Sequence, residues 1–507
     1  MTHRRVTVAA GVLGAALALT AWSSGSRSIG MRSVDAPLTI GQTANLVGNF
    51  NPYRLSPGNF VFMYQLYDTL IRQDAALNPQ PRLASSWEFS RTGHSLTLHL
   101  RSATFSNGQP ITSQIVADDI ALVKQPATGA NIIGLAAEIL AVRTPDPRTV
   151  VLDFGKAYPG VWDFLNLLFI TDPATVSSVY LTVDASGPFQ LSQYTPGVSF
   201  TMTPNPDFWG VKPKLSSVTV KILPDEQTLV NSLQAGAIDF AGLITPLDYS
   251  TLKTNSAFSV GVAAAANSVL AFSINVTRPP LDKLYVRRAL SLALNRQRIA
   301  DDFLGGAGSP ACLPFNTPTQ LGYDKTLSNY CKFDLNTAKK LIIASGVGNV
   351  TFTILTSTST NPVYTQMAEV FQADLATIGV TANIQDVDLS TFSADQLNSN
   401  FDIIAVAYGR ANLDPSTLFG ATAVWNPAQN ESSFKGAMYS SLVAQGGSTY
   451  NKALRAKVYK EVDKIILGNV FVLSVATNPR PYAFVKAMNG LQVAVNGQPI
   501  LEGVTLS

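Results

Sequence analysis

The sequence is poor in the residues that most often build metal sites and nucleophilic centres. Its 507 residues include two cysteines and three histidines, and charged residues make up 14% of the chain. Beyond the N-terminal segment the histidines are His94 and His99, and on a strand their odd separation would place them on opposite faces. A metal site made of histidines and a Ser-His-Asp triad are therefore disfavoured, and we expect no metal and no cofactor.

The short motifs of several enzyme classes are also missing. The sequence contains no HExxH, CxxC, GxxxxGK or GxSxG pattern. Two Ser-x-x-Lys matches, Ser250/Lys253 and Ser432/Lys435, lack the partner motifs of penicillin-recognising enzymes. Asp and Glu total 33, so a secreted hydrolase with paired carboxylates, acting on a peptide or glycan, stays open as the alternative function.

Long hydrophobic runs are absent apart from one near the N-terminus. Residues 6–19 are apolar and follow a basic start, a pattern typical of a secretion signal. As a helix this run would span about 21 Å, less than the ~30 Å hydrocarbon core of a bilayer. Residues 19–26 resemble the end of a lipoprotein signal, but Trp22 stands where the acylated cysteine belongs. We therefore expect residues 1–34 to be a signal and tether, and the protein to be exported to the periplasm or cell surface without a lipid.

The two cysteines, Cys312 and Cys331, are expected to pair if the protein is exported to an oxidising compartment. A disulfide closing such a loop contributes on the order of 3 kcal/mol to stability. Two separately buried free thiols are the alternative.

The overall composition is that of a globular protein with many turns. Hydrophobic residues make up 46% of the chain, and 35 Gly and 29 Pro are spread along it. The length predicts about three packed units. The formal net charge is +3, without a run of Lys and Arg interleaved with aromatic residues, so nucleic acid is not an expected partner.

Hydrophobic periodicity predicts a mixed α/β chain with an α/β domain in its second half. The expected helices of that half are 281–304, 335–344, 364–378 and 452–467, and the expected strands are 350–355 and 401–407. Alternating helices and strands favour a largely parallel sheet. The strand-like stretch 491–506 is expected to return to the first domain.

Five segments, in this order, carry motifs of one known family. They are residues 81–88 (PRLASSWE), 105–110 (FSNGQP), 186–189 (SGPF), 205–210 (NPDFWG) and 286–296 (VRRALSLALNR). Together they resemble the bacterial extracellular solute-binding proteins of family 5, which serve dipeptide, oligopeptide and nickel ABC importers. The tryptophans and glycines of these motifs are expected to pack and to form turns, so the motifs indicate the fold without marking the ligand.

The resemblance implies a two-lobed periplasmic-binding-protein-like α/β fold with hinge strands and an extra α+β subdomain. The expected boundaries are 35–80, 181–274 and 486–507 for lobe I, 81–180 for the accessory subdomain and 275–485 for lobe II. The implied function is capture of an oligopeptide or a similar-sized solute between the lobes, without catalysis. The implied partners are an ABC permease and its ATPase, at the outer face of the cell membrane.

The same resemblance suggests where the ligand is held. In peptide-binding relatives an Asp four residues before a D/E-P dipeptide holds the ligand's amino terminus. The dipeptide here is Asp414-Pro415, and counting back four places gives Ala411, beside Arg410. An arginine favours a ligand carboxylate, so we expect an acidic or N-blocked peptide, or a non-peptide of similar size. The alternative is an alignment offset in which Asp414 itself is the anchor.

Further residues are expected to line the cleft because of their place in the sequence or their residue type, and Trp425 is one of them. Tyr408 and Gly409 precede the anchor position, and the segment Ser56-Pro57-Gly58 matches a ligand-pairing segment of the family. Trp425 is expected to form an aromatic wall.

Overall fold

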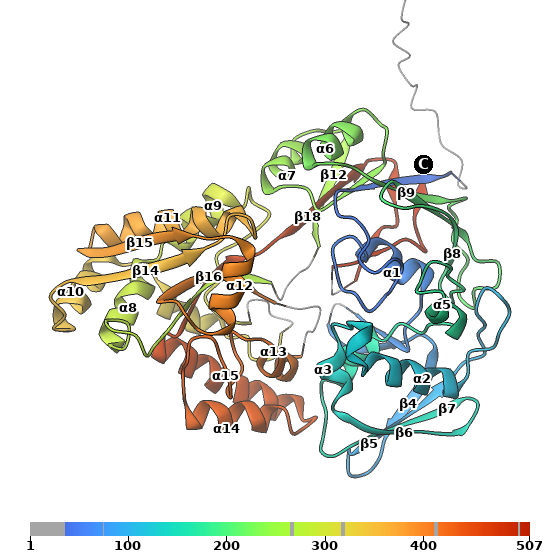
Figure 1. Ribbon diagram of the computed structural model, residues 1–507, viewed down its shortest axis with the longest axis horizontal. Coiled ribbons are helices and arrows are strands. Elements are labelled where there is room, and N and C mark those ends of the chain that lie inside the picture. Colours follow the sequence, from blue (N-terminus) through green and yellow to red (C-terminus); the bar gives the residue numbers. More distant parts are fainter. Residues whose placement is uncertain (1–35, 75, 264–267, 316–319, 410–413, 495–496) are drawn as a thin grey trace, which may run out of the picture.

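The computed structural model describes residues 36–507 except 75, 264–267, 316–319, 410–413 and 495–496. Figure 1 shows two lobes side by side, lobe I on the right and lobe II on the left, with a smaller accessory unit below lobe I. The expected signal and tether, residues 1–34, lie outside the described residues. No helix in the described part of the chain combines the length and apolar character needed to cross a bilayer.

Lobe I is built on a seven-stranded mixed sheet. Its strands, in order across the sheet, are β12 (Phe258–Ala263), β18 (Arg480–Val485), β11 (Phe240–Gly242), β1 (Leu38–Gln42), β10 (Val218–Ile222), β9 (Ser199–Pro204) and β8 (Phe189–Thr195). The central strand β1 pairs in parallel with β10 and β11, and the outer strands pair antiparallel. Leu38 and Ile40 of β1 are fully buried, as expected in the middle of a covered sheet.

Helices and short ladders surround this sheet. The helices of lobe I are α1 (Phe60–Leu66), α4 (Val161–Leu167), α5 (Pro173–Ser177), α6 (Glu226–Gln234) and α7 (Pro246–Lys253). Three two-stranded ladders pair β2 (Ile71–Gln73) with β3 (Pro79–Pro81), β19 (Met488–Asn489) with β22 (Thr505–Leu506), and β20 (Gln492–Val493) with β21 (Pro499–Ile500). Gln65 of α1 donates to the Pro499 carbonyl at 2.9 Å and accepts from the Leu501 amide at 3.0 Å. The C-terminal stretch therefore returns to lobe I, as predicted.

The accessory unit is an antiparallel sheet with helices on one side. Its strands, in order, are β4 (Ala84–Phe89), β5 (Ser95–Leu100), β7 (Thr149–Phe154) and β6 (Ile139–Asp146), and its helices are α2 (Ser113–Val123) and α3 (Ile133–Ala136). Period-two alternation buries Leu96, Leu98 and Leu100 of β5, while His99 is exposed. The Thr112 side chain caps α2.

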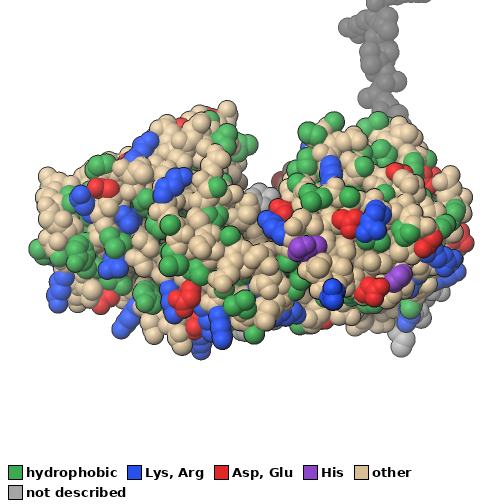
Figure 2. Space-filling view, turned by 90° about the horizontal axis from the view of Figure 1, so that it is seen from below, with side chains coloured by type: hydrophobic (Ala, Val, Ile, Leu, Met, Phe, Trp, Pro, Cys, Tyr) green, Lys and Arg blue, Asp and Glu red, His purple; other side chains and the backbone are tan. Residues whose placement is uncertain are grey.

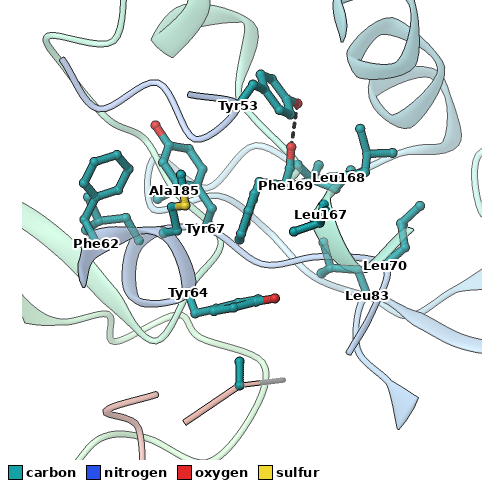
Figure 3. Packing of buried hydrophobic residues seen from close by; sticks show 14 of the residues in the cluster. Tyr53, Phe62, Tyr64, Tyr67, Leu70, Leu83, Leu167, Leu168, Phe169 and Ala185 are labelled. Carbon is teal, nitrogen blue, oxygen red and sulfur yellow. Dashed lines mark hydrogen bonds between the residues drawn. The ribbon is translucent and has the colours of Figure 1, made fainter. Parts of the chain in front are cut away.

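Lobe I and the accessory unit share one hydrophobic core. Figure 3 shows part of it, with Tyr64 and Tyr67 of the α1 region packed among leucines and phenylalanines. Tyr53 donates a hydrogen bond to the Phe169 carbonyl at 2.6 Å. Because a common core joins them, the two units form one body.

Lobe II contains a five-stranded sheet and has its own core. The strand order is β15 (Val380–Asp386), β14 (Val350–Thr356), β16 (Ile403–Tyr408), β13 (Val269–Ile274) and β17 (Val472–Thr477). The helices are α8 (Leu284–Ala293), α9 (Arg296–Phe303), α10 (Leu335–Ala344), α11 (Pro362–Ala376), α12 (Leu389–Leu397), α13 (Pro415–Ala421), α14 (Ala437–Gly446) and α15 (Lys452–Asn469). The predicted helices at 335–344, 364–378 and 452–467 are thereby confirmed, and the predicted strands correspond to β14 and β16.

The prediction of a largely parallel sheet in lobe II was wrong. β14 pairs in parallel with β15 and β16, whereas β13 pairs antiparallel with both β16 and β17. The parallel pairs come from helical crossovers through α11 and α12. β13 and β17 instead carry the chain into and out of the lobe, so they run antiparallel to each other.

The predicted domain boundaries differ from the structure by one strand at each crossing, and by α4 and α5, which the predicted accessory subdomain 81–180 included and which belong to lobe I. β13 (Val269–Ile274), assigned to lobe I, belongs to the lobe II sheet, and β18 (Arg480–Val485), assigned to lobe II, belongs to the lobe I sheet. The predicted helix 281–304 is also two helices, because α8 ends at Ala293 and Asn295 caps α9 by accepting from the Arg298 amide at 3.0 Å. The two-lobed α/β fold with an extra α+β unit is confirmed.

Candidate ligand-binding site

The lobes are joined by two chain crossings that lie next to each other. One lies between β12 and β13, and the other leads from β17 to β18 through Asn478 and Pro479. The Asn478 amide donates to the Ser268 carbonyl at 2.8 Å, and the Asn478 side chain bonds to the Ser268 hydroxyl at 3.2 Å. Figure 1 shows β18 extending from this junction into lobe I. Such a narrow connection can act as a hinge, because few backbone torsions separate the two bodies.

A hollow lies in lobe I beside the crossing, and its empty space, counting the part open to solvent, is about 520 Å³. Its lining comes from the end of β1, the start of α1, β11 and the start of β18, and consists of Gln42, Thr43, Ala44, Pro57, Phe60, Val61, Phe240, Gly242, Leu243, Arg480, Tyr482, Gly497 and Pro499. The wall is largely apolar. Its described lining contains no carboxylate, histidine or cysteine.

Of the predicted segment Ser56-Pro57-Gly58, Pro57 lines this hollow. Gly58 is fixed in place because a Cβ would lie 1.9 Å from the Asn45 carbonyl oxygen. Its own carbonyl accepts from Gln42 Nε2 at 3.0 Å. Pro57 is exposed and lines the hollow, while the buried Ser56 hydroxyl has no hydrogen-bond partner among the described residues.

Two polar groups of the lining are unpaired within the described structure. The guanidinium of Arg480 lies 5.0 Å from the ring centre of Phe60, without an ion pair or hydrogen bond to a described residue. Burial lowers the pKa of Arg480. Gln42 donates through Nε2 to Ala44 and Gly58, and its buried Oε1 accepts from no described residue.

The lobes also touch at a second place, away from the hinge. Asp163 of α4, which is 1% exposed, accepts from the Asp414 amide and from the Thr417 hydroxyl of α13, both at 2.8 Å. Tyr450 of lobe II accepts from the Tyr158 amide at 2.9 Å. Figure 2 shows the two lobes as separate masses with a notch between them. Contacts at the hinge and at Asp163 therefore enclose the space between the lobes from two sides.

The predicted residues of lobe II are only partly in a position to bind a ligand. Tyr408 ends β16, is 3% exposed, and its hydroxyl lies 2.7 Å from that of Ser474, while burial raises its pKa. Gly409 follows with φ of 144°, a conformation that favours glycine. Arg410 and Ala411 lie outside the described residues.

Asp414 is already engaged within lobe II. It caps α13 by accepting from the Ser416 amide at 2.9 Å, and it forms an ion pair with Arg455. Burial opposes the charge of Arg455, but the Asp414 carboxylate raises its pKa overall. These bonds leave Asp414 poorly suited to hold a ligand ammonium.

Trp425 requires a correction, since it is a core residue in this structure. Its side chain is 0% exposed and packs against Tyr408, Phe419 and Phe471. An aromatic wall must present its ring to the ligand, and this ring is covered by lobe II. Cys312 and Cys331 form a disulfide with Cα atoms 5.8 Å apart.

Sequence reasoning did not single out four residues that line the hollow, namely Arg480, Gln42, Phe60 and Tyr482. A weak signal existed for Arg480, which stands between two prolines at the start of an otherwise apolar segment. The others lack a local signal, because the hollow forms only when the ends of β1 and β18 meet the start of α1.

Comparisons with known proteins support one family. The sequence model described as "Bacterial extracellular solute-binding proteins, family 5 Middle" matches residues 78–429. Di/tripeptide-binding protein 1 of Pseudomonas aeruginosa is 26% identical over 439 residues, covering 78% of this chain and 80% of that protein. The nickel-binding periplasmic protein of Escherichia coli is 24% identical over 408 residues, covering 75% and 76%.

A solved structure shares the fold. The ABC transporter substrate-binding protein CtaP of Listeria monocytogenes superposes with a TM-score of 0.83 at 21% identity, covering 94% of this chain and 100% of that chain. The predicted family is thus supported by the matched sequence, the two lobes and their paired crossings. The chain belongs to the bacterial extracellular solute-binding proteins, family 5.

Proposed function

We propose that this protein is the extracytoplasmic binding component of an ABC importer and holds a solute of peptide size between its lobes. The observation that carries the proposal is the pair of lobes joined by a narrow double crossing and meeting again at Asp163, with an apolar hollow on lobe I beside the crossing. Closure around a solute at such a place is the behaviour expected of a capture protein. Its partners would be a membrane permease and an ATPase, and the paired-carboxylate hydrolase has no support in the pocket lining.

Export is part of this proposal. The apolar segment 6–19 would direct the chain across the membrane, and Trp22 would leave it without a lipid. The binding protein would then meet its permease at the outer face of the membrane.

Native mass spectrometry of protein purified from its own host tests the function directly. We expect a co-purifying molecule of about the mass of a short peptide, released when the protein is denatured. A protein that carries no ligand, and that acquires none from peptide mixtures or host extract, would contradict the proposal.

The ligand is proposed not to need a free α-amino group. The family's acidic anchor position is Ala411, and the nearby Asp414 carboxylate is held by α13 and Arg455. A ligand ammonium would therefore lack a counter-charge at this place, whereas Arg410 offers a bidentate donor to a ligand carboxylate.

Calorimetry with paired peptides tests this. Acetylation of the peptide N-terminus is expected to change the affinity by less than about threefold, and Arg410→Ala is expected to lower it at least tenfold, about 1.4 kcal/mol. Free peptides that bind tightly, lose binding on acetylation and are unaffected by Arg410→Ala would restore an ordinary amino-terminal anchor.

A further inference from the structure

Arg480 is a cation in an apolar hollow, without a counter-charge among the described residues. It begins β18 directly after the hinge crossing and is half-buried. No described carboxylate pairs with it, and its guanidinium is stacked over Phe60. A cation–π contact replaces only part of the lost hydration of an arginine. The five N–H donors of the guanidinium therefore remain available to a group that enters the hollow.

The surroundings of Arg480 restrict what that group can be. Phe60, Phe240 and Tyr482 supply aromatic surface, and Phe240 stacks with Tyr482 at a centroid distance of 5.6 Å. Gln42 is oriented by its two Nε2 bonds, and its buried Oε1 accepts from no described residue. A fitting ligand thus carries an anion for Arg480, an N–H donor for Gln42 and an apolar group for the rings.

We propose that this hollow binds the C-terminal residue of the ligand, with its carboxylate on Arg480, its amide N–H toward Gln42 Oε1 and an apolar side chain against the aromatic wall. The assignment rests on the proposed function and adds the ligand class and its orientation. A carboxylate with a neighbouring amide also occurs in N-acyl amino acids, so the experiment includes one. It is separate from the role proposed for Arg410, which lies outside the described residues.

The test compares acids with amides. The probes are tripeptides ending in leucine or phenylalanine, each as the free acid and as the C-terminal amide, together with N-acetyl-leucine and its amide. Calorimetry is expected to show the acids binding at least tenfold tighter than the amides. Arg480→Met should bring this ratio to near one, Arg480→Lys should keep part of it, and the exposed control Arg91→Gln should leave it unchanged.

Thermal unfolding without ligand supplies a second readout. Arg480→Met is expected to raise the unfolding temperature of the empty protein, because it removes an unpaired cation from an apolar place. A clearly lower unfolding temperature of Arg480→Met would indicate that Arg480 stabilises the fold. It would overturn the assignment of Arg480 as a ligand-binding residue.

The remaining outcomes separate the two proposals. Tripeptides that bind equally well as acids and amides, or an acid preference that survives Arg480→Met and is lost in Arg410→Ala, would overturn this site and leave the function standing. If none of the probes binds, both the peptide-sized ligand and this site fail. An acid preference shown by N-acetyl-leucine at equal or higher affinity supports the same site for a smaller ligand.

Discussion

At the scale of single residues, Asp119 joins three parts of the first body. This α2 residue is 3% exposed and accepts from the Tyr53 hydroxyl and the Thr171 amide, both at 2.9 Å, and from the Thr171 hydroxyl. Burial raises its pKa from 3.8 to about 7, although the hydrogen bonds from Thr171 and Tyr53 oppose the rise. The carboxyl therefore takes up a proton on folding at mildly acidic pH.

The sign of the resulting pH dependence follows from this raised pKa. The contribution of Asp119 to stability is fully present below pH 3.8 and is lost as the pH rises to about 7. Replacement by Asn keeps the acceptor and removes the titration. We expect the difference in unfolding free energy, wild type minus Asp119→Asn, to decrease as the pH rises over this range. The decrease is expected to be on the order of 4 kcal/mol.

Urea unfolding at several pH values measures this difference. The exposed Asp207, which lies outside this cluster, provides the control, and Asp207→Asn is expected to follow the wild type over the same range. If the difference between the wild type and Asp119→Asn is independent of pH, Asp119 is not the titrating group.

At the scale of secondary-structure elements, the long helices of lobe II were predictable. α10 begins and ends where its amphipathic pattern does, and α11 and α15 differ from their predicted limits by two residues at most at each end. Their limits are set locally, by caps such as Asp334, Asn361 and Asn451. Local chemistry of this kind is visible in the sequence.

Strand partnership was not predictable in the same way. β13 and β18 both have the pattern of buried strands, and their own residues do not specify which sheet they join. Their membership is decided by pairing with β16 and β12, which lie more than a hundred residues away in sequence. Trp425 shows the same limit, since Phe471, one of the residues that cover it, lies beyond α14 and α15 in the sequence.

At the scale of the whole molecule, the candidate site depends on the relative position of two bodies. The crossing at Asn478 fixes one edge of the space between them, and the contacts of Asp163 with Asp414 and Thr417 close another. The sequence motifs indicated two lobes, but neither contact has a local signature. A carboxylate that accepts two hydrogen bonds across the junction favours the closed arrangement, because opening must rehydrate all three groups.

Asp163→Ala should shift this balance toward the open arrangement. Small-angle scattering is expected to give a larger radius of gyration for the empty variant than for the empty wild type, and saturating ligand should compact the wild type more completely. Because part of the binding energy would then be spent on closure, the variant should also bind the ligand more weakly. Thr417→Val removes one of the two donors, and its radius of gyration and affinity should lie between those of the wild type and Asp163→Ala.

The exposed Asp207→Ala is the control for loss of a carboxylate in lobe I. Identical scattering of the wild type and Asp163→Ala, both empty and saturated, would show that the Asp163 contact does not govern closure.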